Sequence, residues 1–364
     1  MTMTSDARIA SVPQAARKEW AREHLKGVES TLRVSFAPDL IDFDEAGIRH
    51  DVREHIRSGF NSMLCTQPGL NAQEKMRFMA IAADEAQGRI LLSATADDDD
   101  LNVSMEILAK AESLGFSHSI LRVPSVLGES EDAIFAKYKH VIESTNLGII
   151  LFATKKPQFA HLHPSSIPLN LYRRVAALPN VVGVKVTQWL DPTMVMQVCD
   201  YLADRIFINT ANLSMIPLLA KSYPIQWMGE WNIQAVQSPE QPFAVEFMDH
   251  INAGNTEKAL EVYWKLAPAF QYFADLQRNF LIVGSHPWPH LKYYQWLVGG
   301  NGGIYRMVDE TAILDEAGRT AIKKAYKASG INITEGPIDE FLVGKANYAK
   351  GIRPKDFVDL PCWK

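Results

Sequence analysis

A single lysine, Lys185, interrupts the run 181–187, Val-Val-Gly-Val-Lys-Val-Thr, which otherwise has the composition of a buried strand. An ammonium group on a strand that is apolar on both faces is costly unless it reaches a cavity. Lysine becomes a nucleophile when loss of water lowers its pKa, because the neutral amine then attacks carbonyl carbon. The run therefore indicates a candidate Schiff-base lysine. The alternative is a strand-end lysine whose ammonium reaches solvent.

Schiff-base chemistry also needs a site for the carboxylate of a keto acid. Arg122 follows an apolar run, and its planar guanidinium is suited to clamping a carboxylate. Thr66, with the amides up to Gly69, is a candidate anion-binding turn after another such run. The alternatives are a structural ion pair for Arg122 and an ordinary turn for Thr66.

A proton carrier is the third requirement. Glu230 follows the run 225–229 and precedes Trp231, and an apolar neighbour raises the pKa of a carboxyl group towards the range of a general acid. A carboxylate that hydrogen-bonds a neighbouring loop is the alternative for Glu230. Asn209 and Asn232 are candidate hydrogen-bonding partners of the substrate.

Two other polar clusters are candidates for a metal site. The run Asp97 to Asp100 favours the start of a helix, because aspartates cap the N-terminal dipole, but clustered carboxylates also bind magnesium. A metal there would leave Lys185 without a role. His161 and His163 form a His-x-His pair on an expected loop, which is weak evidence for zinc. We therefore predict no metal and no cofactor.

The composition excludes several classes of protein. The 364 residues carry a formal net charge of −5, so no basic surface favours a nucleic-acid partner. The three cysteines show no CxxC spacing, which disfavours a disulfide framework and a thiolate zinc site. No apolar run reaches membrane-spanning length and the N-terminus carries no signal-like apolar stretch, so we expect a cytoplasmic protein with no membrane partner.

Strand-like and helix-like segments alternate eight times, which predicts a (β/α)₈ barrel. No G-x-G-x-x-G follows the first expected strand, so a dinucleotide-binding sheet is disfavoured. We expect a leader helix over 12–26 within 1–27, with Trp20 and Leu25 as its apolar anchors and Gly27 as its stop, and the barrel over 28–255. The region 256–364 is expected to hold helices over 256–283, 290–297 and around 309–328, followed by an irregular tail. The expected pairs are 32–36 and 44–58, 62–65 and 72–87, 90–94 and 102–114, 119–123 and 132–144, 148–152 and 167–177, 181–186 and 193–201, 206–209 and 215–221, and 225–229 with a helix from Pro239.

Barrel enzymes carry their chemistry at the carboxyl ends of the strands. This rule brings the candidates Thr66, Arg122, Lys185, Asn209 and Glu230 to one rim. It leaves His118, at the start of the fourth expected strand, at the opposite end.

The run 178–187, LPNVVGVKVT, resembles the lysine segment of the dihydrodipicolinate synthase and N-acetylneuraminate lyase family of class I aldolases. The segments 41–44, IDFD, and 286–292, HPWPHLK, resemble two further motifs of that family. The resemblance implies a strand-six lysine that forms a Schiff base with a 2-keto acid, typically pyruvate. It also implies a homotetramer.

The departures from the family pattern are specific. The segment 65–70, CTQPGL, stands where the family has G-T-T-G-E, and Phe152 stands where a tyrosine relays protons. Pro-Ser-Val at 124–126 replaces a P-Y-Y segment, so dihydrodipicolinate synthase activity is not expected. The run Phe152-Ala153-Thr154, with Phe159 and His163-Pro164, and Arg122 resemble the hydratase-aldolase branch, which acts on aryl-substituted pyruvates.

We therefore expect a lyase that makes or breaks a carbon–carbon bond through an imine on Lys185. The aromatic residues Phe152, Phe159, Trp189 and Trp231 favour an apolar or aryl substituent. Two alternatives remain open: a dehydratase or hydratase that uses the same imine, and a barrel that binds a keto acid without turning it over.

Overall fold

The structure is a computed structural model and describes residues 9–66, 68–187, 191–210, 212–229, 231–283, 287–303, 306 and 313–358. For residues 231, 232 and 279–283 it describes the backbone alone. None of the described helices is both long enough and apolar enough to cross a membrane.

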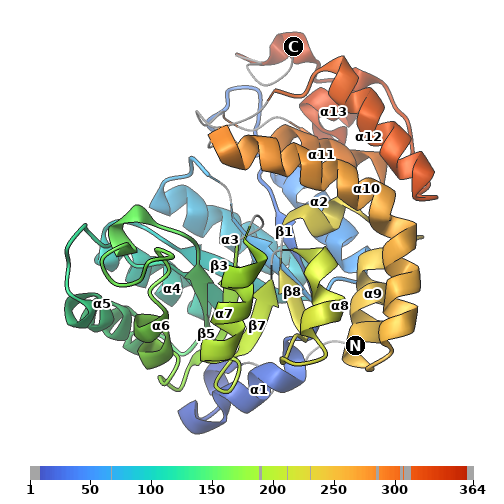
Figure 1. Cartoon of the computed structure of the whole chain (residues 1–364). Coiled ribbons are helices and arrows are strands. Elements are labelled where there is room, and N and C mark those ends of the chain that lie inside the picture. The colour runs from blue at the N-terminus through green and yellow to red at the C-terminus, as the bar shows by residue number, and fades with distance from the viewer. Residues whose placement is uncertain are drawn as a thin grey trace.

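Eight parallel strands form a nearly closed barrel, so the predicted (β/α)₈ fold is confirmed (Figure 1). Hydrogen bonding runs in the order β7-β6-β5-β4-β3-β2-β1-β8, and the side chain of Asn209 bridges β7 and β8. The strands are β1 (Gly27–Leu32), β2 (Ser62–Cys65), β3 (Leu91–Ala96), β4 (His118–Leu121), β5 (Gly148–Ala153), β6 (Val181–Val186), β7 (Phe207–Thr210) and β8 (Trp227–Gly229).

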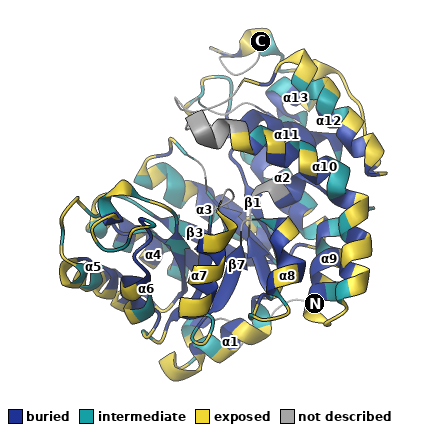
Figure 2. Cartoon of the chain, viewed as in Figure 1, coloured by how far each residue is buried: buried dark blue, intermediate teal, exposed yellow. Residues whose placement is uncertain are grey.

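Helices surround the strands, with buried faces towards the sheet and exposed faces outward (Figure 2). Short polar side chains begin several of them: Asp44 accepts a hydrogen bond from the Gly47 amide, and Asn71 forms a capping box with Glu74. The surrounding helices are α2 (Glu45–Arg57), α3 (Ala72–Ala86), α4 (Leu101–Ser113), α5 (Glu131–Glu143), α6 (Leu169–Val175), α7 (Pro192–Leu202), α8 (Ile216–Leu219) and α9 (Phe243–Asn252).

The first strand lies earlier than predicted, at Gly27–Leu32 rather than 32–36. Its middle residues, Glu29, Ser30 and Thr31, are polar but buried, so apolar periodicity did not mark it. Such burial is tolerated because the groups find partners: the Ser93 hydroxyl donates to Glu29 Oε1 over 2.6 Å.

The leader closes the amino-terminal end of the barrel. The predicted helix over 12–26 is shorter, α1 (Arg17–His24), after the 3₁₀ turns η2 (Ile9–Ser11) and η3 (Gln14–Ala16). Gly27, expected to stop the helix, begins β1. The predicted anchors Trp20 and Leu25 are buried among side chains from inside the barrel, which include Leu64, Leu91, Ile120, Ile150, Val182, Phe207 and Trp227. These side chains thereby fill the amino-terminal end of the barrel.

The chain beyond the barrel is more helical than predicted. Helix α10 (Thr256–Val283) has the predicted bounds, α11 (Trp288–Leu297) begins two residues early, and α12 (Glu316–Ala328) begins within the predicted 309–328, of which 309–312 lie outside the described residues. The tail expected to be irregular contains α13 (Ile338–Val343), α14 (Lys345–Ala349) and the turn η7 (Pro354–Asp356). Phe341 explains this, because its ring packs against Tyr293 and Trp296 of α11.

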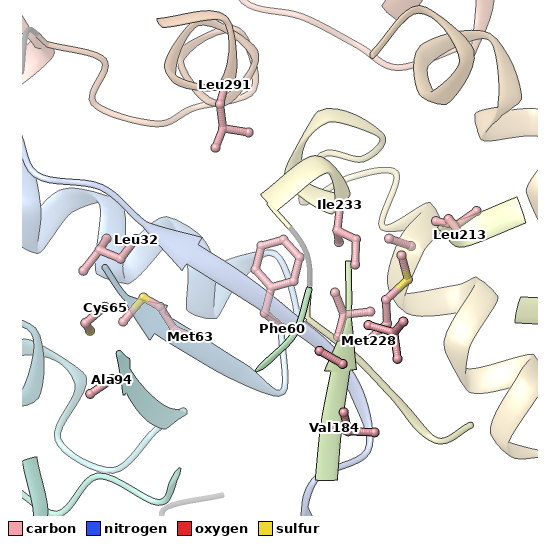
Figure 3. Close-up of a cluster of buried hydrophobic side chains, with 14 of the residues drawn as sticks. Leu32, Phe60, Met63, Cys65, Ala94, Val184, Leu213, Met228, Ile233 and Leu291 are labelled. Carbon is pink, nitrogen blue, oxygen red and sulfur yellow. The ribbon is translucent and has the colours of Figure 1, made fainter. Parts of the chain in front are cut away.

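A buried polar network holds α11 to the segment just after the first strand. Lys292 is 1% exposed, and its Nζ donates to Ser35 Oγ over 2.7 Å and to the Gly302 carbonyl over 3.0 Å. Burial lowers the pKa of Lys292 to about 8, although Asp51 and Asp44 act in the opposite direction. Beside this network, Leu291 points from α11 towards the strands (Figure 3).

His55 of α2 connects three further elements. Its Nδ1 lies 3.0 Å from Ser30 Oγ, whose proton is donated to the Ser62 carbonyl, so Nδ1 carries the imidazole proton. Its Nε2 accepts from the side-chain amides of Gln234 and Gln295 over 3.0 and 3.1 Å. Burial lowers the pKa of His55 to about 3, so the ring is neutral in the folded protein.

We predict that His55 makes the fold sensitive to acid. The unfolded chain takes up this proton near pH 6.5 while the folded chain does not until about pH 3, so stability falls as pH drops through this window. The loss is about 1.4 kcal/mol per pH unit below 6.5. Chemical denaturation at pH 6.5, 5.5 and 4.5 measures it, and His55→Gln should reduce the slope by about that amount. An unchanged slope would contradict the assignment.

Candidate active site

A cavity of about 350 Å³ opens at the carboxyl ends of the strands. Inward-facing residues from β1 to β6 and the loops that follow them form most of its wall, and α10 and α11 add one residue each. The lining residues are Thr31, Arg33, Leu64, Thr66, Pro68, Thr95, Asp97, Ile120, Arg122, Phe152, Thr154, Lys156, Lys185, Thr187, Gln277 and Trp288.

Lys185 lies in this wall, near the end of β6, and is 6% exposed. In the sheet it pairs with Phe152 of β5 and Asn209 of β7. The register between β5 and β6 shifts below it, because Val182 is an extra residue between the pairs Ile149–Val181 and Ile150–Gly183. Such a bulge redirects the side chains above it, here turning Lys185 inward.

Arg33 is a cavity residue that the sequence analysis missed. It is 4% exposed, its guanidinium lies 3.8 Å from the ring centroid of Trp288, and its Nη1 donates to the Thr66 carbonyl over 3.0 Å. The sequence does contain a signal for Arg33. Glu29, Thr31 and Arg33 are spaced two residues apart, so their side chains point to the same face of an extended chain. The misplaced first strand concealed it.

Arg122 follows β4 and faces the same cavity. Its Nη2 donates to the Asp97 carbonyl over 2.6 Å, and among the described residues it has no carboxylate partner. The structural ion pair considered as an alternative is therefore absent from this part of the chain. The Asp97 carboxylate instead lies 3.4 Å from Lys75 Nζ.

The turn after β2 brings Thr66 to the cavity. Pro68 also lines it, and proline has no amide proton, so the turn offers one donor fewer than an all-amide nest. Gly69 has φ +79° and borders a neighbouring recess with Asp97 and Asp98. Gln67 lies outside the described residues.

Phe152 occupies the wall next to Lys185, and its ring carries no proton to transfer. Two buried tyrosines serve the fold: the Tyr172 hydroxyl donates to the Phe152 carbonyl over 3.1 Å, and Tyr172 packs edge-on against Tyr138. Burial raises the pKa of Tyr138 to about 12 and raises the pKa of Tyr172 well above its usual value. Among the described residues that line the cavity, none is a tyrosine.

The other residues predicted to contact the substrate are not among the described lining residues of the cavity. Asn209 is fully buried, its Nδ2 donates to the Gly229 carbonyl over 3.0 Å, and it is not one of the cavity-lining residues. A role in substrate binding for Asn209 remains a prediction. Glu230 and Trp189 lie outside the described residues, and of Asn232 and Trp231 the structure describes the backbone only.

The two candidate metal clusters have structural partners. Asp100 caps α4 by accepting a hydrogen bond from the Asn102 amide, and Asp98 accepts one from the Asp100 amide. These contacts agree with the interpretation of the aspartate run as the start of a helix. His161 Nε2 lies 2.7 Å from the Glu129 carbonyl, and His163 Nδ1 lies 2.7 Å from Ser165 Oγ. No group of three potential metal ligands occurs in the described part of the chain.

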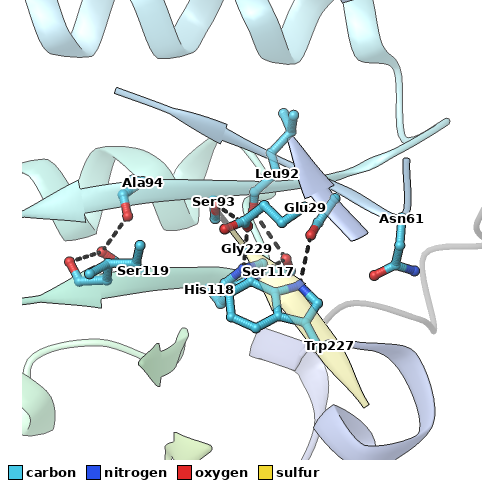
Figure 4. A network of polar contacts seen from close by, with 12 residues as sticks. Glu29, Asn61, Leu92, Ser93, Ala94, Ser117, His118, Ser119, Trp227 and Gly229 are labelled. Atoms are coloured by element: carbon cyan, nitrogen blue, oxygen red, sulfur yellow. Dashed lines mark hydrogen bonds and ion pairs between the residues drawn. The ribbon is translucent and has the colours of Figure 1, made fainter. Parts of the chain in front are cut away.

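Polar groups also form the layer beneath the cavity (Figure 4). Glu29 Oε1 accepts from Ser93 and lies 2.8 Å from His118 Nε2, while its Oε2 has no hydrogen-bond partner among the described residues. His118 therefore lies towards the end opposite the site, as predicted. Gly229 is required here, because a Cβ on it would lie 2.8 Å from Glu29 Oε2 and 2.6 Å from the Trp227 ring.

Two further residues that line the cavity, at positions that the sequence did not single out, carry buried side-chain oxygens. Thr187 Oγ1 and Gln277 Oε1 have no hydrogen-bond partner among the described residues. Thr187 follows Lys185 by two residues and shares its face, a spacing that was readable from the sequence. Gln277 and Trp288 come from helices beyond the barrel, which strand periodicity does not locate.

The fold and this rim define a (β/α)₈ barrel with a buried lysine at the end of its sixth strand. Residues 24–223, more than half of the chain, match the model of the dihydrodipicolinate synthetase family. The chain belongs to that family of Schiff-base aldolases and lyases.

Individual relatives are distant. The chain is 22% identical to the 4-hydroxy-tetrahydrodipicolinate synthase of Methanopyrus kandleri over 67% of this chain and 80% of that one. Its structure is similar to that of dihydrodipicolinate synthase from Aquifex aeolicus, with a TM-score of 0.66, 16% identity and coverage of 85% and 100%. N-acetylneuraminate lyase from Fusobacterium nucleatum gives a TM-score of 0.65 at 17% identity, with coverage of 84% and 98%. At such identities the structures establish the fold alone.

We predict that Arg33→Met weakens the binding of pyruvate about 10- to 100-fold, because a hydrogen bond from a buried charged group contributes about 1.5–3 kcal/mol. Isothermal titration calorimetry measures the change. Arg53→Met, in an exposed ion pair with Glu85, is the matched control and should bind like the native protein. Native-like affinity in a folded Arg33→Met variant would contradict a role for Arg33 in anion binding.

Proposed function

We propose that this protein is a class I lyase that forms an imine between Lys185 and a 2-keto acid and makes or breaks a carbon–carbon bond. The observation that carries the proposal is the position of Lys185, a buried amine in the wall of a cavity that also presents two arginines. Membership of a family of Schiff-base enzymes supports it.

The carboxylate of the keto acid is assigned to the side of the cavity formed by Thr66, Arg33 and Arg122. This assignment places the keto carbon towards β6, where the neutral Lys185 amine adds to it. Loss of water then leaves an iminium, whose positive nitrogen accepts electron density from the adjacent carbon. Cleavage of the next carbon–carbon bond delivers its electron pair to this carbon, and the aldol hydroxyl loses its proton as the carbonyl of the leaving fragment forms.

Phe152 cannot receive that proton, so another group must. We assign the transfer to Glu230, which follows β8, and we assign the hydroxyl oxygen to a position near Gln277 and Thr187. Buried polar atoms without partners favour a polar ligand, because an unsatisfied buried oxygen is costly. The two side chains thus support a substrate that carries a hydroxyl group.

We assign an apolar or aryl substituent to the part of the cavity lined by Leu64, Ile120, Phe152 and Trp288. This agrees with the resemblance of 152–154 to the hydratase-aldolase branch. Phe159, predicted to contribute, is 4% exposed and packs in the hydrophobic core instead of the cavity wall.

The central test is chemical trapping. Incubation with pyruvate and borohydride should give a reduced adduct on the peptide that contains Lys185, detected by mass spectrometry. Lys185→Ala should give no adduct and lower kcat/KM by at least about 10³-fold, because the covalent route is lost. Absence of an adduct from every 2-keto acid tried on folded protein, or full activity of Lys185→Ala, would refute the imine.

Gln277→Leu separates binding of the hydroxyl group from formation of the imine. We expect kcat/KM for cleavage of a hydroxylated substrate to fall about 10- to 100-fold, since a buried hydrogen bond is lost, while pyruvate trapping stays within about 2-fold. Stopped-assay kinetics and adduct mass spectrometry give the two readouts. Equal losses in both would show that Gln277 acts through the fold and not on the hydroxyl.

Phe152 favours one second candidate, a protein that binds a keto acid through the imine without turnover. Trapping without product from any aldol or unsaturated keto acid would favour it. A dehydratase or hydratase would release water or add it while the carbon chain stays intact. We propose a homotetramer by family resemblance, although one structural neighbour is described as a monomeric dihydrodipicolinate synthase variant.

A further inference from the structure

Among the described residues, the wall of the cavity carries more positive than negative charge. Arg33, Arg122 and Lys156 line it together with Lys185, which must be neutral to act as a nucleophile. Asp97 is the single acidic residue among the described lining residues, and its carboxylate already lies beside Lys75. Three cationic side chains therefore face one shared, partly enclosed cavity.

Lys156 differs from the two arginines in its surroundings. Arg33 donates to the Thr66 carbonyl and Arg122 to the Asp97 carbonyl, so both are held on the side formed by β1 to β4. Lys156 follows β5, is half-buried, and within the described chain its ammonium has neither a hydrogen bond nor an ion pair. Its neighbour Lys155 is exposed and does not line the cavity.

Like charges around a partly desolvated cavity repel one another, and this cost is relieved by a ligand of opposite charge. A keto acid with one carboxylate, bound beside Arg33 and Arg122, leaves Lys156 without a counter-charge. A second anionic group on the substituent would meet it. A cavity of about 350 Å³ is within the size range of sites for small organic ligands.

We propose that the substrate is a 2-keto acid with a second anionic group, a carboxylate on its substituent, and that Lys156 is the residue that recognises it. The proposal rests on the imine chemistry proposed above and refines the substrate class. The substituent then has an apolar part against Phe152 and Ile120 and a charged end at Lys156.

The test compares two linear keto acids that differ at their far end: 2-oxoglutarate, which ends in a carboxylate, and 2-oxohexanoate, which ends in an alkyl group. The measured quantity is the concentration that gives half-maximal borohydride trapping on Lys185. We expect 2-oxoglutarate to be trapped at a concentration at least about 10-fold lower, as expected for a charged hydrogen bond. The preference should shrink as salt is raised.

Two lysine variants identify the residue responsible. Lys156→Gln should reduce the preference to within about 2-fold, whereas Lys155→Gln, adjacent in sequence but outside the cavity, should retain it. Thermal unfolding checks that both variants are folded. Equal trapping of the two acids by the native protein, or a preference that survives in Lys156→Gln, would overturn the proposal.

The same experiment separates this proposal from the one on which it rests. If pyruvate is trapped but 2-oxoglutarate shows no advantage, the second anionic group is rejected while the imine stands. If no keto acid is trapped, both are rejected. If the preference moves with Lys155 and not with Lys156, charge near the mouth matters but the assigned contact is wrong.

Discussion

The nearly closed parallel barrel has to accommodate charged groups in its interior, where they need hydrogen-bonding partners. Glu29 is one example, and one of its carboxylate oxygens is held by Ser93 and by the ring of His118. Apolar side chains from α1 and from the strands fill the amino-terminal end of the barrel. With that end filled, the cavity that contains Lys185 opens at the carboxyl ends of the strands. Lys185 is tolerable on β6 because that cavity exists.

Much of this arrangement was readable from the sequence. The bounds of β2, β6 and α10 were predicted correctly, because each is a continuous run with clear ends. The rule for barrel rims then placed Thr66, Arg122 and Lys185 together. The first strand was misplaced because Glu29 and its neighbours are polar yet buried, and the partners that permit this are 64 and 89 residues away. Gln277 and Trp288 were missed for a similar reason, since they reach the rim by tertiary packing alone.

The departures from the family pattern form a consistent group in space. Pro68 removes an amide donor after β2, and Arg33 brings a guanidinium to the carbonyl of the same turn. Phe152 lacks a hydroxyl beside Lys185, and Thr187 and Gln277 are other polar residues in the wall of the same cavity. The positions that depart from the family motifs thus lie around Lys185 together with polar side chains from other parts of the chain.

The network around Lys292 joins α11 to the chain just after β1, and the same helix begins with Trp288, which covers Arg33. Gln277 and Trp288, which line the cavity from helices beyond the barrel, therefore belong to a different layer of the chain from Lys185 on β6. The two layers are joined by a few buried polar contacts. Substitutions in the outer helices can thus reshape one part of the cavity wall while the strand that carries Lys185 stays unchanged.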